Sequence, residues 1–380
     1  MATASIPTTQ QALWLKSAKG AWVIEPNAVP KPEKGEVLTR IESSALNPVD
    51  WKIHDYDFGV SEYPAIIGQD IAGVVVAVGE GVENVKVGDR VLHQGVLNKR
   101  QAGFQQYTIV PAGVVAKFPA SLSFDEASTL PVGVATATVG LYSSNAVQSA
   151  TLVAPWKTDG RGKYADQPIL ILGGSSAVGQ SVIQFAKLSG FSPIITTVSP
   201  RNNDFVTSLG ATHTIDRNEP LSSLSASVKA ITTKPLTLVF DAVATAETQI
   251  AGYEVLHNEG GVLVVVLVAN VPEADQVPGK RIAAPYGSAP HHGAFGEEVY
   301  AHLSAYLESG DVKPNQVDYV AGGLGSIPDA LDKLRKNKSL IKIKFAEAAV
   351  GVETSRTTYD QTTVRVKAPM NEKFAKVIIA

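Results

Sequence analysis

The chain of 380 residues is long enough for two domains, each of which can bury its own core. Its 33 basic and 36 acidic residues give a net charge of −3, which excludes the basic field of a nucleic-acid-binding protein and favours a small-molecule partner. The absence of cysteine excludes disulfides, thiolate catalysis and every cysteine-ligated zinc or iron–sulfur site.

Two patterns concern the location of the protein. Residues 1–20 contain no positively charged leader followed by an apolar core, so they do not resemble a signal peptide. The longest apolar run, residues 261–269, is shorter than the roughly 20 residues that span a bilayer. We therefore expect a soluble, cytoplasmic protein that binds neither nucleic acid nor a membrane.

The first third of the chain alternates short strand-like runs with turn signals. The runs span 12–15, 21–24, 36–43, 71–78 and 90–93, and turn residues such as Gly, Pro, Lys and Asp separate them. Such spacing indicates a compact, largely antiparallel β domain. A helix is expected next over 124–142, with Asp125 and Glu126 in its first turn, and Pro131 must interrupt or kink it.

From residue 169 onward, strands alternate with helices. Strands are expected at 169–172, 194–198, 212–215, 236–241 and 262–268, and helices at 177–188, 204–209, 221–231 and 245–256. This alternation indicates a doubly wound parallel sheet, so the predicted fold class is α/β. The polar segment 143–168, which is rich in Gly, Pro and Lys, is expected to connect the two domains on the surface.

The last part of the chain adds a helix at 295–309, and then a helix at 327–335 followed by a strand at 340–345. The last helix and strand are expected to return to the first domain. The predicted organisation is a β-rich domain of residues 11–142 and 316–347, a parallel-sheet domain of residues 143–315, and an extension, 348–380, to which the pattern assigns no role. Residues 374–379 of this extension could form an edge strand or none.

A glycine-rich turn joins the first strand of the predicted parallel sheet to its first helix. Gly174, Ser176 and Gly179 have the spacing of the dinucleotide-binding fingerprint, although Ser176 stands where the second glycine usually does. A tight structural turn gives the same spacing, but the surrounding α/β pattern favours a loop that brings backbone N–H groups and a helix N-terminus to a pyrophosphate. The remaining residues of this predicted cofactor loop are Ser175, Ala177 and Val178.

The residues after the second strand predict which nicotinamide cofactor binds. NAD sites place an Asp or Glu there to accept from the ribose hydroxyls, whereas NADP sites use a hydroxyl and an arginine for the 2′-phosphate. Here Ser199, Arg201 and Asn202 follow the strand and no carboxylate is available at that point, so we predict NADPH. Arg217, just after the third strand, is a second phosphate-binding candidate. The alternative is that Arg201 is an ordinary solvated surface charge.

Four segments together resemble one family. They are NPVDWK at 47–52, GQDIAG at 68–73, AVGEGVENVKVGDRV at 77–91 and GGSSAVG at 173–179. The combination resembles the medium-chain dehydrogenase/reductase superfamily, and within it the zinc-free branch of quinone oxidoreductases and fungal trans-acting enoyl reductases, from about residue 11 to residue 345. The resemblance implies a GroES-like catalytic domain and a Rossmann domain, with the nicotinamide in a cleft between them.

The chain departs from the zinc-dependent branch of this family at both ligand motifs. Those enzymes have a cysteine before an aspartate in the first motif and a histidine as the second residue of a GHE-type motif, whereas residues 47–50 contain no cysteine and Gln69 replaces the histidine. Gln and Asp cannot replace thiolate and imidazole ligands around zinc, and without a Lewis acid nothing stabilises the developing alkoxide charge of an alcohol. We therefore predict no zinc and no alcohol oxidation.

Reduction of a C=C bond already polarised by a carbonyl needs less from the protein. Hydride goes to the β carbon, charge collects on the carbonyl oxygen, and a proton arrives later from a donor or from water. The predicted function is an NADPH-dependent, metal-free reductase of activated C=C bonds, in an enoyl thioester or in a smaller enone or quinone. A non-catalytic NADPH-binding or sensor protein is the alternative. An enoyl reductase would take its substrate from the acyl-carrier domain of a polyketide synthase, which the resemblance alone implies.

The resemblance also implies which residues meet the nicotinamide and the substrate. Lys52 would position the cofactor and is a candidate proton source, and Tyr63 is a second candidate donor; a surface lysine and a tyrosine packed beside Pro64 are the structural alternatives. Further cofactor contacts implied are Val49, Asp50, Trp51, Thr136, Leu267, Val268, Leu340 and Ile341. Substrate contacts implied are Pro131, Val132, Gly133, Thr138, Ala284, Pro285, Tyr286, Gly287 and Ser288, with ordinary helix-start packing as the alternative for 131–138.

Two remaining features have structural explanations. His291 and His292 are adjacent, so their side chains point apart on a helix or a strand, and we assign them to a loop rather than to a metal pair. Asp241, which ends the fourth strand of the predicted parallel sheet, either orients a loop or caps the next helix.

Overall fold

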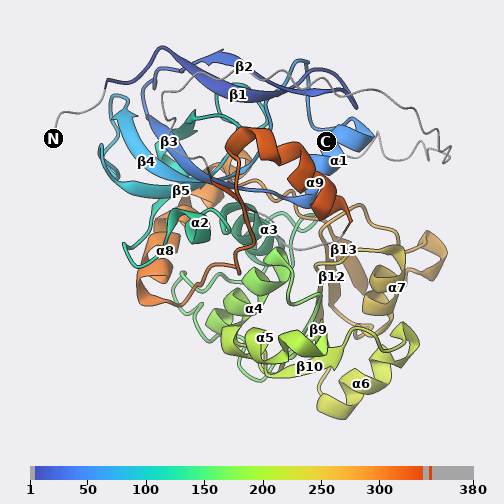
Figure 1. The fold of residues 1–380 in the computed structure, drawn as a ribbon. Helices are drawn as coiled ribbons and strands as arrows, with labels where there is room; N and C mark the ends of the chain where they lie inside the picture. Colours follow the sequence, from blue (N-terminus) through green and yellow to red (C-terminus); the bar gives the residue numbers. More distant parts are fainter. Residues whose placement is uncertain (1–4, 337–341, 345–380) are drawn as a thin grey trace.

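The computed structural model describes residues 5–336 and 342–344. It contains a largely antiparallel sheet, a parallel sheet and a two-stranded ribbon, with helices around and between them (Figure 1). The predicted α/β class, with a GroES-like antiparallel domain and a Rossmann-like parallel sheet, is confirmed. Among the described residues, no helix is both long and apolar enough to cross a membrane.

The antiparallel strands occupy the first third of the chain, as predicted. The ribbon pairs β1 (Thr9–Leu15) with β2 (Trp22–Ala28). The seven-stranded sheet has the order β14 (Tyr319–Val320), β15 (Lys342–Lys344), β3 (Glu36–Ala45), β4 (Asp70–Val78), β5 (Arg90–Gln94) and β7 (Val115–Lys117), and β6 (Tyr107–Pro111) also pairs with β3. Because β15 pairs with β3, the predicted return of the chain to the first domain is confirmed.

The helix α1 (Pro48–Tyr56) was not expected from the sequence pattern. It is short, and its start is fixed by a capping box in which the N–H of Asn47 donates to the Asp50 carboxylate at 2.7 Å. Pro48 occupies the first helical position, where a backbone N–H has no helical carbonyl to bind. The missing N–H of proline therefore costs no hydrogen bond there. Local capping, rather than a long apolar stripe, therefore specifies this helix.

The helical segment predicted at 124–142 is two helices, α2 (Phe124–Ala127) and α3 (Pro131–Tyr142). Pro131 begins α3, so the predicted interruption falls just before the proline, where its missing N–H costs nothing. Nearly every residue of α3 is buried because the helix lies between the two sheets (Figure 1). Its residues share one core with β4, β5 and α8 on one side and with β8 and β11 on the other.

The parallel sheet has the order β10 (His213–Asp216), β9 (Ile194–Val198), β8 (Ile169–Leu172), β11 (Leu238–Asp241), β12 (Gly261–Val265) and β13 (Lys280–Ala283). The helices that follow its strands are α4 (Ala177–Ser189), α5 (Asn203–Leu209), α6 (Leu224–Ile231) and α7 (Ala246–Glu254), and α8 (Gly293–Ser309) and α9 (Ile327–Arg335) come later in the chain. The predicted doubly wound sheet is confirmed. The chain reverses its winding direction between β8 and β11, and sheets of this kind bind ligands at such a reversal.

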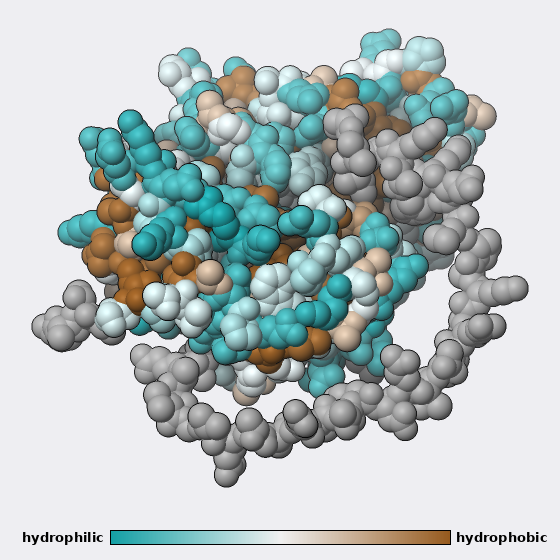
Figure 2. All heavy atoms as spheres, turned by 90° about the horizontal axis from the view of Figure 1, so that it is seen from above, coloured by the Kyte–Doolittle hydropathy of each residue, from teal (hydrophilic) through white to brown (hydrophobic). Residues whose placement is uncertain are grey.

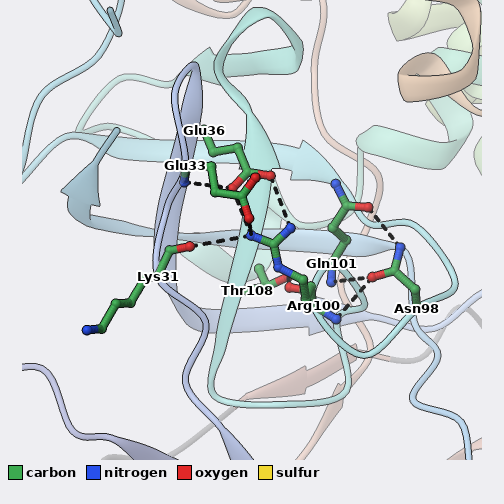
Figure 3. Close-up of polar contacts among 7 residues, drawn as sticks. All are labelled: Lys31, Glu33, Glu36, Asn98, Arg100, Gln101 and Thr108. Atoms are coloured by element: carbon green, nitrogen blue, oxygen red, sulfur yellow. Dashed lines mark hydrogen bonds and ion pairs between the residues drawn. The ribbon is translucent and has the colours of Figure 1, made fainter. Parts of the chain in front are cut away.

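Arg100 forms ion pairs and hydrogen bonds on the surface of the antiparallel part (Figure 3). Its guanidinium lies 3.2 Å from Glu33 and 3.0 Å from Glu36, and it donates to the carbonyl of Lys31 at 3.4 Å. These contacts join the turn before β3 to the loop between β5 and β6. Hydrophilic side chains also predominate on the face above the β1–β2 ribbon, where hydrophobic ones form separate small patches (Figure 2).

Candidate functional site

The glycine-rich turn lies at the carboxyl end of β8, where the winding of the sheet reverses. A Cβ on Gly174 would lie 2.1 Å from the Thr196 Oγ1 atom in β9, and one on Gly179 would lie 2.3 Å from the carbonyl oxygen of Gly173. Neither position has room for a side chain. The two glycines thus let α4 begin directly against the end of the strand, which is the geometry that a phosphate-binding turn requires.

Ser176, at the position of the missing glycine, caps α4. Its hydroxyl accepts a hydrogen bond from the N–H of Gly179 at 3.0 Å and donates to the carbonyl of Gly173 at 2.8 Å. Within the described residues, the N–H groups of Ser175, Ala177 and Val178 make no hydrogen bond. The serine consequently secures the helix start while three neighbouring amides are left to bind an anion.

Two arginines follow neighbouring strands next to this turn. Val198 pairs with Asp216, and the N–H of Arg217 donates to the carbonyl of Val198 at 3.0 Å, which places Arg217 beside the end of β9. Arg201 lies in a single 3₁₀ turn that starts after Ser199. Both arginines are exposed, and neither forms an ion pair with any described residue. Ser199, Arg201 and Arg217 could therefore hold a 2′-phosphate, for which guanidinium groups are well suited.

Lys52 lies on α1, partly buried beside Trp51. Its ammonium is 5.7 Å from the centre of the Trp51 ring, and burial lowers its pKa from the ordinary value of a lysine. The helix is braced by α9, because Arg335 donates to Asp55 at 2.8 Å and its guanidinium lies 5.8 Å from the Trp51 ring. Lys52 is thus held on a fixed helix, and its lowered pKa makes it a better proton donor than a solvated lysine.

Asp50 is completely buried and supports α1 from within. One of its oxygens accepts from Asn47, and the other has no hydrogen-bond partner in the described part of the chain. The neighbouring Asp70 accepts from the Asn47 side chain at 2.9 Å and from the N–H of Val132 at 2.7 Å. This network joins the start of α1 to the start of α3. The structure therefore gives Asp50 a capping position, with no surface exposed to a cofactor.

Burial of Asp50 leads to a pH-dependent stability. Burial raises the pKa of Asp50 to about 8, against about 3.9 for an exposed aspartate. Between about pH 4 and about pH 8 Asp50 keeps a proton in the folded protein that it loses in the unfolded chain, so the contribution of Asp50 to the free energy of unfolding falls as pH rises. Asp50→Asn keeps an oxygen for Asn47 and cannot titrate, so denaturant midpoints of this variant should fall less over that range than those of the wild type.

The control for this measurement is Asp204→Asn, at an exposed position in the first turn of α5. It should leave the pH dependence of the midpoint as in the wild type. If the midpoints of the wild type and of Asp50→Asn change equally between about pH 5 and about pH 8, the assignment of a protonated Asp50 is contradicted.

Tyr63 bonds to Asp57, the residue that caps the carboxyl end of α1. Its hydroxyl donates to the Asp57 carboxylate at 3.0 Å, and burial together with Asp57 raises the pKa of Tyr63 to about 12. A phenol that is both bound to a carboxylate and shifted in this direction releases its proton less readily. Of the two candidate donors, Lys52 therefore has the more suitable electrostatics.

Thr136, implied to contact the cofactor, and Thr138, implied to contact the substrate, both lie on α3. Both threonines are buried, Thr136 with 8% and Thr138 with 0% of its surface exposed. The hydroxyl of each donates to the carbonyl four residues earlier, at Val132 and Val134, at 2.8 Å. A Cβ on Gly287 would lie 2.1 Å from the Thr136 Oγ1 atom, which shows that the loop 284–288 packs on α3. Tyr286 of this loop is 48% exposed. The structure thus brings Thr136 and the loop together.

The loop after β12 is shaped by two buried polar side chains. The strand predicted at 262–268 ends at Val265, so Leu267 and Val268 belong to this loop and Leu267 is exposed. Gln249 donates to the carbonyl of Val268 at 3.1 Å and accepts from the N–H of Asn270 at 2.7 Å. Asp241 accepts from the N–H groups at 243 and 244 and from the Thr248 hydroxyl, so it both orients a loop and supports the start of α7. Leu340 and Ile341 lie outside the described residues.

The two adjacent histidines bind the substrate-side loop. His291 shares a hydrogen bond of 2.7 Å with the Ser288 hydroxyl, and His292 lies 2.8 Å from the carbonyl of Tyr286. In the part of the chain that the structure describes, no group of three or more potential metal-ligating side chains is present. Sequence reasoning missed Gln94 and Gln249, each a buried glutamine that holds a loop. Gln94 follows His93 and Gln249 follows Thr248, so neither lies within an apolar run that could have marked it as buried.

Two family profiles match the chain. The profile described as alcohol dehydrogenase GroES-like domain matches residues 33–120, and the one described as zinc-binding dehydrogenase matches residues 177–288. The chain is 33% identical over 343 residues to the trans-enoyl reductase himH of Aspergillus japonicus, covering 88% of this chain and 96% of that protein. It is 30% identical over 345 residues to lovC of Aspergillus terreus, the enoyl reductase component of lovastatin nonaketide synthase, covering 82% and 89%.

A solved structure gives the same picture of the fold. An alcohol dehydrogenase superfamily protein from Novosphingobium aromaticivorans has a TM-score of 0.73 at 26% identity, and the match covers 89% of this chain and 100% of that chain. The first family profile includes α1 with Lys52, and the second runs from Ala177 through Arg201 and Arg217 to the loop 284–288. The residues between the two profiles include α3 and the first part of the glycine-rich turn.

Proposed function

The chain belongs to the medium-chain dehydrogenase/reductase superfamily, and from this premise we propose that it is an NADPH-dependent, metal-free reductase of activated C=C bonds, acting on enoyl thioesters. The cleft is proposed to lie between a GroES-like domain of residues 11–142 and 316–347 and a Rossmann domain of residues 143–315. The observation that carries the proposal is the combination of a glycine-rich turn, whose amides are unbonded within the described residues, and a first motif, residues 47–50, without cysteine, together with Gln69 in place of the histidine of the zinc-dependent branch.

The zinc ion implied by the name of the second profile does not fit these residues. The chain has no cysteine, and the Asn47 side chain already donates to Asp70 at 2.9 Å. Gln69 offers a neutral amide in place of an imidazole, which is a poor donor for zinc. Alcohol oxidation through a zinc-bound alkoxide is therefore not part of the proposal, whereas addition to an already polarised C=C bond needs no such ligand set.

The mechanism assigns separate tasks to the chain's own groups. When bound, NADPH supplies the hydride that reaches the β carbon of the substrate. The amides of the glycine-rich turn hold the pyrophosphate, and Ser199, Arg201 and Arg217 hold the 2′-phosphate. Lys52 orients the nicotinamide ribose and delivers a proton to the α carbon or, through solvent, to the enolate oxygen. The loop 284–288 borders the acyl chain.

The names of the relatives support a tethered substrate. Those of himH and lovC identify enoyl reductases, and lovC is a component of a polyketide synthase by its name. We propose by analogy that the acyl-carrier domain of a polyketide synthase presents the substrate to this protein.

The proposed function predicts turnover with a defined panel of acceptors. The full-length protein should oxidise NADPH in the presence of a thioester-activated enoyl substrate, and more slowly with simple enones and quinones. Lys52→Met should lower kcat by about a hundredfold, the usual contribution of a general acid. The measurement is the loss of NADPH absorbance together with mass spectrometry of the saturated product.

The matched control is Lys86→Met, which removes an exposed lysine from the loop before β5 and should leave kcat unchanged. Faster turnover with quinones than with enoyl thioesters would identify a quinone oxidoreductase instead. Tight NADPH binding without oxidation by any acceptor of the panel would favour a sensor or binding protein and refute the enzymatic proposal.

A further inference from the structure

Gln94 is a buried glutamine at the carboxyl end of β5 that bonds across to the substrate-side loop. Its amide nitrogen donates to the carbonyl of Gly287 at 2.8 Å, and its amide oxygen accepts from the N–H of Ala289 at 2.9 Å. The Gln94 side chain is only 1% exposed. Both ends of one amide are thus used to hold the backbone on either side of Ser288.

The position of Gln94 in the sheet connects it to the start of α3. Gln94 is the register partner of Asp70 in β4, and the Asp70 carboxylate accepts from the N–H of Val132 at the beginning of α3. The adjoining ends of β4 and β5 therefore hold two parts of the site at once: β4 holds α3, and β5 holds the loop that packs on Thr136 of the same helix.

Other contacts hold the rest of the loop, since the N–H of Ala284 donates to the carbonyl of Val147 at 2.9 Å, but at Gly287 and Ala289 it is the Gln94 amide that binds the backbone. Ala284 and Tyr286 are exposed, whereas Ala289 is buried with 2% of its surface accessible. Without the Gln94 amide, the carbonyl of Gly287 and the buried N–H of Ala289 would lose their partner, and a buried polar group without a partner is costly. The loop would then move to satisfy these groups elsewhere.

We propose that Gln94 is a positioning residue for the substrate side of the site. By holding residues 287–289 against α3, it fixes the exposed Tyr286 ring at the place where the acyl chain of an activated enoyl substrate enters. The inference rests on the proposed function for its substrate, but the restraint on the loop does not depend on turnover.

The test compares Gln94→Leu with a matched variant, Gln105→Leu. Gln105 is also fully buried, donates to the carbonyl of Ala102 at 2.9 Å and accepts from Gln10 and Asn27 at 3.1 and 2.9 Å, all within the antiparallel part. Gln94→Leu should raise KM for the enoyl substrate by about tenfold and leave the NADPH Kd within about twofold. Gln105→Leu should lower Tm without changing KM.

A second measurement separates this inference from the proposed function. Amide hydrogen exchange of the peptide covering 284–292 should become faster in Gln94→Leu than in the wild type and stay unchanged in Gln105→Leu, even where no acceptor is turned over. Gln94→Glu keeps the acceptor for Ala289 and regains a donor for Gly287 only when protonated, so its exchange should approach the wild-type rate at acidic pH. Exchange that is equal in both leucine variants, or a KM change that Gln105→Leu reproduces, would overturn the proposal.

Discussion

Replacing Gly179 with alanine is expected to weaken NADPH binding by about a hundredfold, which corresponds to about 3 kcal/mol. On helix propensity alone the change should stabilise α4 by up to about 1 kcal/mol, since glycine is the poorer helix former. The added Cβ would lie 2.3 Å from the Gly173 carbonyl oxygen and 2.9 Å from the Gly174 Cα atom. The helix start must therefore move away from β8, and the free amides of Ala177 and Val178 move with it.

The measurement is an NADPH titration of the folded variant, with circular dichroism to establish that its helices are intact. Gly325→Ala is the matched control, because the nearest atom to its Cβ would be 3.8 Å away, on the Ile24 side chain. It should bind NADPH as the wild type does. Wild-type affinity in Gly179→Ala would show that the turn is structural and that the cofactor binds elsewhere.

The parts of this site that follow from the sequence are those fixed by neighbours along the chain. The strand, turn and helix around Gly174 are local, and Pro131 by itself marks the start of α3. The end of β12 is different. Its apolar run continues to residue 268, but the strand stops at Val265 because that residue pairs with Asp241, the last residue of β11. The end of a strand depends on where its partner strand ends. The apolar pattern of one segment carries no information about that partner.

On the substrate side of the site, even less could be predicted from the sequence alone. The resemblance assigned Thr136 to the cofactor and Thr138 to the substrate. Residues two positions apart on an α-helix differ by about 200° of rotation, and it is Thr136 that meets the loop at Gly287. Gln94 reaches residues more than 190 positions later in the chain. Such contacts depend on the fold of both sheets, whereas the charge at the end of β9 depends on only a few consecutive residues.

The positive charge of the arginines that follow β9 and β10 leads to the second large expected effect, on the affinity for NADPH. Arg201→Ala and Arg217→Ala are each expected to weaken NADPH binding by about 10- to 100-fold, because a charge-assisted hydrogen bond to a phosphate contributes about 1.5–3 kcal/mol. NADH affinity should stay within about twofold in both variants, since its ribose hydroxyl carries no charge for a guanidinium to bind. Titration with each nucleotide, and a thermal shift with each, measure the difference directly.

The double variant tests whether the two arginines bind the same phosphate. If they do, their effects are coupled, and the loss in the double variant should differ from the product of the single losses. Arg161→Ala, which removes an exposed arginine paired with Asp311 at 3.0 Å, is the control and should change neither affinity. Equal stabilisation of the wild type by NADPH and NADH would remove the phosphate-binding role from both arginines. If the preference for NADPH over NADH is lost in Arg201→Ala and Arg217→Ala but not in Arg161→Ala, the residues that follow β9 and β10 determine which cofactor binds.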